Sequence, residues 1–313
     1  MHVGIAGEVR CVVTKADGAV KFDTGYQKNL ILNQGLEFFG GGKGGYINAS
    51  CAIGSGNSAP EINQTALDAY IAQASGTDIT SSYAYVDKGD NLYRMWEQKK
   101  YRFTGLADGN ISEVGLVSTG TTSTNYYLTT RALIKDSSGA PTSISVKTGE
   151  VLDVYYKIHK VIDTRDKAFV INMSDGNGEA VPYNVVVRPA MVGDGGSWSV
   201  SRTAIENPGN LAGSAATLAD LTAITSKPSA NYISNTHSNK PYIPMSNKLI
   251  VNRSYGLNDY VTGVRTIVSY SNYFFSLQVR FGSVANDSPI PKTNKDTLTI
   301  PLEISWGRYE GTL

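Results

Sequence analysis

Apolar and polar residues alternate along many short segments of this chain, and that alternation constrains its fold more than any other feature. In the clearest segment, VLDVYYKI, the side chains of Val154, Tyr156 and Ile158 would share one side of an extended chain. A period of two residues is typical of a β-strand, whose side chains point in turn to the two faces of a sheet. Further strands are expected at 8–14, 19–23, 92–104 (as a pair of strands), 111–117, 126–134, 169–173, 184–188, 198–202, 264–270, 273–281 and 297–306. These segments predict a mainly-β fold.

A chain of 313 residues is long enough for two ordinary domains or for one large all-β domain. The strand-like segments pause after Asp163 and then resume, which favours a boundary there. We therefore expect two β-sandwich-like domains with a few short helices, one formed by residues 1–163 and the other by residues 164–313.

Three segments depart from the strand pattern because their apolar residues recur near helical spacing. They are NLILNQGLEFF at 29–39, TALDAYIAQA at 65–74 and LAGSAATLADLTAI at 211–224. We expect a short helix in the first and the third, and one or two helical turns in the second. A stretch rich in Ser, Asn, Pro and Lys at 225–246 is expected to form a long loop or arm in the second domain.

The ends of the two halves resemble each other. KTGEVLDVYYKI at 147–158 lines up with KTNKDTLTIPLEI at 292–304 after one gap, so that the alternating apolar residues coincide. Either the chain contains two β-domains of related plan, or two amphipathic strands are similar by chance. The sequence leaves both interpretations open.

The charge content of the chain is low. Asp, Glu, Lys and Arg make up 18% of the residues, against roughly 25% in typical soluble domains, and the net charge is only +1. Such a chain has no summed field that would attract phosphate backbones or anionic lipid, so nucleic acid is not expected as a partner. A surface poor in charge and rich in Ser, Thr, Asn, Gly and Tyr suits contacts inside a permanent assembly.

Aromatic and cysteine usage add two expectations. The chain has 19 Tyr against 8 Phe, and a ring with one polar tip suits half-buried positions, either between subunits or on the faces of ordinary sheets. Cys11 and Cys51 are too few for a disulfide scaffold and are expected to be buried thiols. No apolar run approaches the roughly 18 residues of a membrane helix, and no leader-like segment opens the sequence. We expect synthesis in a bacterial-type cytoplasm and no membrane insertion.

Residues that carry chemistry are not grouped in any known motif. His2, His159 and His237 stand outside every metal-ligand spacing. No serine lies in a GxSxG elbow, and GGGKGGY around Lys43 lacks the first glycine and the final Ser or Thr of a phosphate-binding loop. Paired carboxylates for glycoside hydrolysis depend on the fold, and no pair stands out. We expect no catalytic residue, no cofactor and no metal.

Four phrases of the first half occur in a recognisable order. They are DTGYQKNLILNQGLEFFG at 23–40, AIGSGNSAPEINQTALDAYIA at 52–72, NISEVGLVS at 110–118 and RALIKDSSGAPTSISVKTGEVLDVYYKI at 131–158. Together they resemble a family of tail-associated structural proteins of tailed bacteriophages. The resemblance covers residues 1–163 and implies a β-sandwich virion component without catalytic residues. The insert GGGKGGYIN at 40–48 and the whole second half depart from it.

The resemblance implies an assembly role. It indicates a virion subunit of the tail, the baseplate or the tail-fibre attachment, made in the host cytoplasm, whose partners are other copies of itself and other tail proteins. Alternatives are a tip module that binds a receptor or a host surface glycan, an envelope-degrading tail enzyme, and a head-tail collar or decoration protein. The interface candidates are Tyr93, Trp96 and Tyr101 in one aromatic segment, and Tyr232 and Tyr242 in an arm at 228–244 that would extend over a neighbour.

Overall fold

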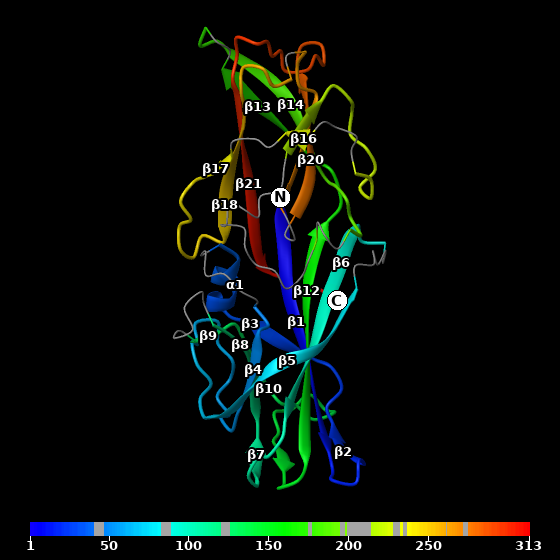
Figure 1. Ribbon diagram of the computed structural model, residues 1–313, viewed down its shortest axis with the longest axis vertical. Helices are drawn as coiled ribbons and strands as arrows, with labels where there is room; N and C mark the ends of the chain where they lie inside the picture. The colour runs from blue at the N-terminus through cyan, green and yellow to red at the C-terminus, as the bar shows by residue number, and fades with distance from the viewer. Residues whose placement is uncertain are drawn as a thin grey trace.

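A computed structural model confirms the mainly-β fold class (Figure 1). It describes residues 1–40, 47–82, 89–119, 126–174, 177–194, 198, 214–227, 232–233, 237–260, 262–271 and 275–313. Across this part of the chain the only helix is α1 (Asn33–Gly40). The molecule is elongated, with strands β2 and β7 at one end and β13 and β14 at the other (Figure 1).

The strands of the first half are β1 (His2–Thr14), β2 (Val20–Asp23), β3 (Gln27–Ile31), β4 (Ser50–Gly54), β5 (Tyr70–Ser82), β6 (Leu92–Phe103), β7 (Gly109–Ile111), β8 (Glu113–Thr119), β9 (Tyr126–Leu128), β10 (Thr130–Leu133), β11 (Ile144–Val146) and β12 (Val151–Asp163). Those of the second half are β13 (Lys167–Ser174), β14 (Ala180–Pro189), β15 (Ser214–Thr217), β16 (Tyr232–Ile233), β17 (His237–Asn239), β18 (Lys248–Tyr255), β19 (Thr266–Ser271), β20 (Phe275–Ser283) and β21 (Leu298–Arg308).

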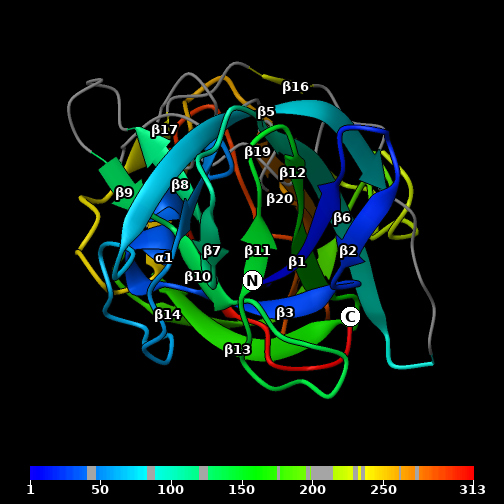
Figure 2. The same cartoon turned by 90° about the horizontal axis from the view of Figure 1, so that it is seen from below.

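Eight strands of the first half close into a barrel. Their order is β1-β12-β6-β5-β4-β8-β10-β3, and β3 pairs with β1 to complete the ring. Every neighbouring pair in the ring is antiparallel. Figure 2 looks along the long axis, with the barrel strands arranged around the centre. A closed ring leaves no open edges, so the first half takes the form of a barrel and not of two stacked sheets.

The longest ladder of the barrel runs through β12, which pairs with β1 on one side and β6 on the other without a register shift. The alternation in this strand predicted its faces correctly, because Val154, Tyr156 and Ile158 are completely buried. Cys11 of β1 is also buried, as expected, and burial raises the pKa of its thiol to about 12.

Three strands share the other edge of β1. β21 pairs with its first residues in parallel, β3 pairs with its middle and β2 with its end. Through β21, strands β18 and β17 join the same sheet. Residues 164–313 therefore contribute strands to the sheet that residues 1–163 begin, and the division of the chain into two domains stays a prediction.

A second, six-stranded sheet lies beyond the barrel. Its order is β13-β14-β20-β19-β15-β16, and all its pairs are antiparallel. Side chains such as Val185, Leu277 and Phe281 belong to the same continuous apolar core as the barrel. β13 pairs only with β14 and therefore forms one edge of this sheet. A short ladder of β7 and β11 stands at the opposite end of the molecule (Figure 1).

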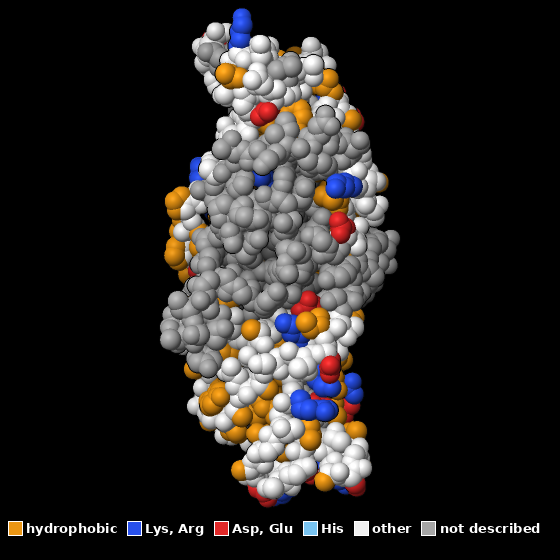
Figure 3. Space-filling view, viewed as in Figure 1, with side chains coloured by type: hydrophobic (Ala, Val, Ile, Leu, Met, Phe, Trp, Pro, Cys, Tyr) orange, Lys and Arg blue, Asp and Glu red, His pale blue; other side chains and the backbone are white. Residues whose placement is uncertain are grey.

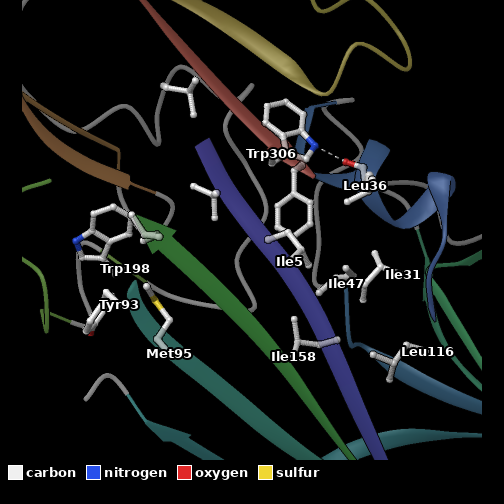
Figure 4. Close-up of a cluster of buried hydrophobic side chains, with 14 of the residues drawn as sticks. Ile5, Ile31, Leu36, Ile47, Tyr93, Met95, Leu116, Ile158, Trp198 and Trp306 are labelled. Carbon is white, nitrogen blue, oxygen red and sulfur yellow. Dashed lines mark hydrogen bonds between the residues drawn. The ribbon is translucent and has the colours of Figure 1, made fainter. Parts of the chain in front are cut away.

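Two tryptophans are fixed inside this core by their ring nitrogens. The indole N–H of Trp306 in β21 donates to the carbonyl oxygen of Leu36 in α1 at 2.8 Å, the bond drawn in Figure 4. The indole N–H of Trp198 donates to the carbonyl oxygen of Ala190 at 3.0 Å. Each ring is almost completely buried, so each polar tip has a partner where water cannot reach it.

The helix predictions are corrected in three places. At 29–39 the helix is real but begins at Asn33, because the preceding residues form β3. At 65–74 the helical turns are wrong, since β5 begins at Tyr70 and pairs with β4. At 211–224 the predicted helix is wrong for the residues described, because β15 pairs with β19. Sheet pairing overrode the local helical spacing in both of the latter cases.

The strand predictions need fewer changes. Segment 92–104 is a single strand, β6, and not a pair of strands, because it pairs with β12 from end to end. The predicted loop at 225–246 contains the short strands β16 and β17. The glycine-rich residues 41–46 and most of the strand predicted at 198–202 lie outside the described residues.

Lys160 is an unusual inward-facing residue of β12. Its side chain is completely buried, and burial lowers its pKa to about 7, against the opposing influence of Glu97. The ammonium form is therefore held in the core at a cost near neutral pH.

We predict that Lys160→Met makes the stability of the chain less dependent on pH. An unfolded lysine keeps a pKa of about 10.4, so between about pH 7 and about pH 10 the unfolded chain binds more protons than the folded chain, and stability rises with pH. The free energy of unfolding, measured by urea titration, should therefore favour K160M over the parent most strongly near pH 7. This advantage of the variant should shrink as the pH rises towards 10. Lys15→Met, at an exposed position, should give a constant difference. A pH-independent difference for K160M would contradict the assignment.

Candidate functional site

A buried ionic network fastens one loop to the barrel wall. Glu113 of β8 and Arg131 of β10 have completely buried side chains, and Arg131 Nε donates to Glu113 Oε2 at 2.9 Å. Arg131 Nη2 also donates to Asp68 Oδ2 at 2.8 Å. The Glu113 carboxylate accepts three backbone N–H groups, from Gly56 at 3.0 Å, Asp68 at 3.2 Å and Ala69 at 2.8 Å. Both of its oxygens are thus used by the chain itself.

Glycine makes this close approach possible. A Cβ atom on Gly56 would lie 2.5 Å from Glu113 Oε1 and 2.3 Å from the Cβ of Asp68. A Cβ atom on Gly54 would also lie 2.5 Å from Glu113 Oε1. The Ser58 hydroxyl donates to the Asp68 carboxylate, and this hydrogen bond is the main cause that holds the pKa of Asp68 below its usual value. The two glycines of the GSG phrase therefore leave the space that the Glu113 carboxylate occupies.

The network unites three phrases of the first half that the sequence analysis singled out. AIGSGNSAPEINQTALDAYIA contributes the loop from Gly54 to Asp68, NISEVGLVS contributes Glu113, and the phrase that begins RALIK contributes Arg131. Glu113 and Arg131 are completely buried and bind groups of the chain itself, so they stabilise this loop on the barrel wall.

The aromatic segment proposed as an interface separates into two environments. Tyr93 and Tyr101 are completely buried, and the Tyr101 hydroxyl donates to the carbonyl oxygen of Asn48 at 2.6 Å. Neither ring can contact a neighbouring subunit, so the prediction is wrong for both. The reason is the strand period, because residues 93 and 101 share the inward face of β6 while Trp96 lies on the outer face.

Trp96 belongs to a patch of rings and cations on the outer barrel wall. Lys157 Nζ lies 3.9 Å from the ring centre of Tyr26 and 5.0 Å from that of Trp96. The guanidinium carbon of Arg10 lies 5.7 Å from the ring centre of Tyr155. Trp96 is half-buried and Tyr26 is 37% exposed. This outer patch keeps Trp96 available to a partner.

The two candidates in the proposed arm are placed differently. Tyr242 stacks on Trp306 with ring centres 5.9 Å apart, and its hydroxyl donates to Glu37 Oε1 at 2.6 Å. Burial, reinforced by Glu37, raises the pKa of this hydroxyl. Tyr242 therefore packs on its own chain and does not extend over a neighbour. Tyr232 lies in β16, which pairs with β15, and much of the arm, 228–231 and 234–236, lies outside the described residues.

An apolar cleft of about 940 Å³ opens between the six-stranded sheet and β21. Its lining comes from β13, β14, β20 and β21, and from residues at the start of β1, at the start of β6 and near the end of β12. Its apolar lining includes Phe169, Ile171, Met173, Val185, Val187, Leu277, Val279, Phe281, Leu298, Ile300 and Leu302. Phe169 is 50% exposed, which is a large exposure for an aromatic residue on a sheet face.

Charged groups at the rim of the cleft are paired within the chain. Asp163 accepts hydrogen bonds from Arg165, at 2.9 and 2.8 Å, and from Lys167, and these bonds lower its pKa. Glu303 lies 3.3 Å from Lys248. The cleft therefore favours an apolar ligand over a charged one.

Metal-binding and membrane-spanning features are absent from the described part of the chain. Within it, no group of three or more His, Cys, Asp or Glu residues could hold a metal ion, and His159 instead lies 3.0 Å from Glu8. The described ranges also contain no helix that is long and apolar enough to cross a membrane.

No protein-family model matches this chain, and neither a curated protein nor a solved structure is similar to it.

Sequence reasoning missed the cleft and the ionic network. Both depend on which strands become neighbours, and a sequence pattern does not give that order. One signal was available for the cleft, since Pro301 interrupts an otherwise regular alternating strand, and proline inside a strand indicates an edge.

We predict that Glu113→Gln destabilises the chain by about 3 kcal/mol, because it leaves the buried Arg131 guanidinium without its completely buried counter-charge. Glu303→Gln is the matched control, since it changes an ion pair whose side chains are about half exposed, and it should cost less than about 1 kcal/mol. Urea unfolding followed by circular dichroism measures both. Equal losses would show that the network does not fasten the loop.

Proposed function

We propose that this chain is a non-enzymatic structural subunit of a bacteriophage virion, placed in the tail, the baseplate or the tail-fibre attachment. In this role it is made in the host cytoplasm and acts through contacts with its own copies and with other tail proteins.

The Glu113–Arg131 network carries the proposal. The phrases that resemble tail proteins meet in it, and their polar groups are consumed by hydrogen bonds inside the barrel wall. A network that stabilises the barrel in this way suits a building subunit, whose role requires that it hold its shape.

Exposed apolar residues support the same role. Phe169 and Val170, on opposite faces of edge strand β13, are 50% and 58% exposed. Ile243 and Met245 are 68% and 55% exposed. On the described part of the face drawn in Figure 3, charged side chains are few and apolar ones are scattered between polar groups. Depletion of charged side chains is typical of interface cores, so this face suits contacts with other subunits.

The outer patch favours a second candidate function, a tip module that binds a host surface glycan. Tyr26, Trp96 and Tyr155 are aromatic rings of the kind on which sugar faces stack. Cations already lie over the rings of Tyr26 and Tyr155, so we rank this function second.

We predict that antibodies raised against the recombinant chain label the tail in electron micrographs of purified particles of the phage that encodes it. Antibody absorbed beforehand with the recombinant chain is the control and should leave the particles unlabelled. Intact, purified virions that lack the chain by both labelling and mass spectrometry would contradict the structural role.

A glycan array separates the second candidate from the first. Binding that is lost in Trp96→Ala and kept in Trp306→Phe, where the ring is buried in the core, would favour the tip module. The assembly role predicts that neither the parent chain nor the two variants bind any glycan on the array.

A further inference from the structure

The backbone of β21 has one edge that is only partly covered. The carbonyl oxygen of Glu303 accepts a hydrogen bond from the Met1 amino group at 2.9 Å, and the N–H of Ser305 donates to the carbonyl oxygen of Met1 at 2.8 Å. The N–H of Trp306 donates in the opposite direction, to the carbonyl oxygen of Asn247 at 2.9 Å. Odd-numbered residues of β21 therefore direct their backbone groups towards the β1 side, and even-numbered residues towards β18.

On the β1 side, the pairing of β21 with described residues ends at Met1. β1 covers β21 only from Ser305 to Arg308, whereas β18 covers the other edge from Leu298 to Ser305. No strand among the described residues pairs with the β1 side of Leu298–Pro301. We call this uncovered side of Leu298–Pro301 the open lane. The N–H and carbonyl of Thr299 and the carbonyl of Pro301 point into it, and both residues are exposed. Pro301 contributes no donor there, so the lane offers the N–H and carbonyl of Thr299 and the carbonyl of Pro301, followed by the N–H of Glu303 at the Met1 end.

The open lane runs along the apolar cleft. Leu298, Ile300 and Leu302 face the cleft from β21, and Phe169 faces it from β13. A strand placed in the lane would continue the line of β1 and cover this apolar surface with every second side chain. About five residues would span it, at roughly 3.3 Å per residue.

We propose that this lane binds an extended β-strand of a partner polypeptide, with bulky apolar residues at alternate positions. The strand adds to the free edge of β21 through main-chain hydrogen bonds, and its apolar side chains fill the cleft. The inference deepens the proposed assembly role and rests on it, while the binding experiment below and the labelling of virions can fail separately.

Two observations favour a polypeptide over a lipid or a small apolar molecule. The lane presents backbone donors and acceptors at strand spacing, which only another backbone satisfies as a series. The two acidic groups that line the cleft, Asp163 and Glu303, already have basic partners, so they do not attract a cationic headgroup.

A fluorescent synthetic peptide of alternating valine and threonine, ended by lysine, tests the proposal against the full chain. Anisotropy should show saturable binding. Thr299→Pro removes the Thr299 N–H from the lane and should weaken binding about tenfold, whereas Thr299→Val keeps that N–H and should change binding by less than about twofold. Pro301 shows that β21 accepts proline at an odd position, and circular dichroism checks that both variants fold.

A peptide with the same side chains and N-methylated amides serves as the ligand control, and it should not bind. Equal binding of the two peptides would overturn the proposal and identify the cleft as an apolar pocket of the kind that holds an acyl chain. Absence of binding by the unmodified peptide, or equal binding to parent and Thr299→Pro, would also overturn it.

A covalent version removes the dependence on peptide affinity. Six alternating valine and threonine residues placed before Met1 would extend β1 into the lane, and six glycine and serine residues form the matched control. Hydrogen exchange should show the Thr299 amide protected at least about tenfold more in the first protein than in the second. Equal protection would count against a strand site. Loss of self-association on filling the lane would identify a second copy as the donor of the strand.

Discussion

The structure depends on the pairing of β12 with β1 on one edge and with β6 on the other. These ladders run the whole length of all three strands without a bulge, so they fix the register of the barrel and decide which residues face inwards. The barrel then supplies the edge of β1 on which β2, β3 and β21 assemble. A shift of one residue in the β1–β12 ladder would expose Val154, Tyr156 and Ile158 together.

The sequence predicted the features that depend on the two-residue period of a strand. It failed for the features that depend on which strands pair with each other. Alternation located β12, β20 and β21 and identified the mainly-β class, because side-chain direction follows from the strand itself. It did not show that β3 would return to β1 and close a ring, because closure is a property of pairing. The same limit applied to single residues. Tyr93 and Trp96 were grouped as one aromatic feature, although their odd spacing places them on opposite faces of β6.

The candidate sites show the same division. The glycine phrase, NISEVGLVS and RALIK were each noticed, yet only the fold reveals that Gly56, Glu113 and Arg131 meet. The cleft could not be predicted from the sequence for a related reason, since it lies between strands of two different sheets. β12 and β21, the two strands that carry the repeated pattern, pair with opposite edges of β1. This arrangement is compatible with a duplicated domain and with chance similarity of two strands.

The position of β1 between β12 and β21 has a consequence for how the chain reaches this state. All eight barrel strands lie within residues 2–163, so the barrel can close during synthesis before the later strands leave the ribosome. The contact of β21 with β1 joins residues about 300 positions apart, and contacts of such high order form slowly. During that interval the first residues of β1 stand uncovered on one edge. The order of the strands along the chain therefore allows the barrel to close before β21 pairs with β1.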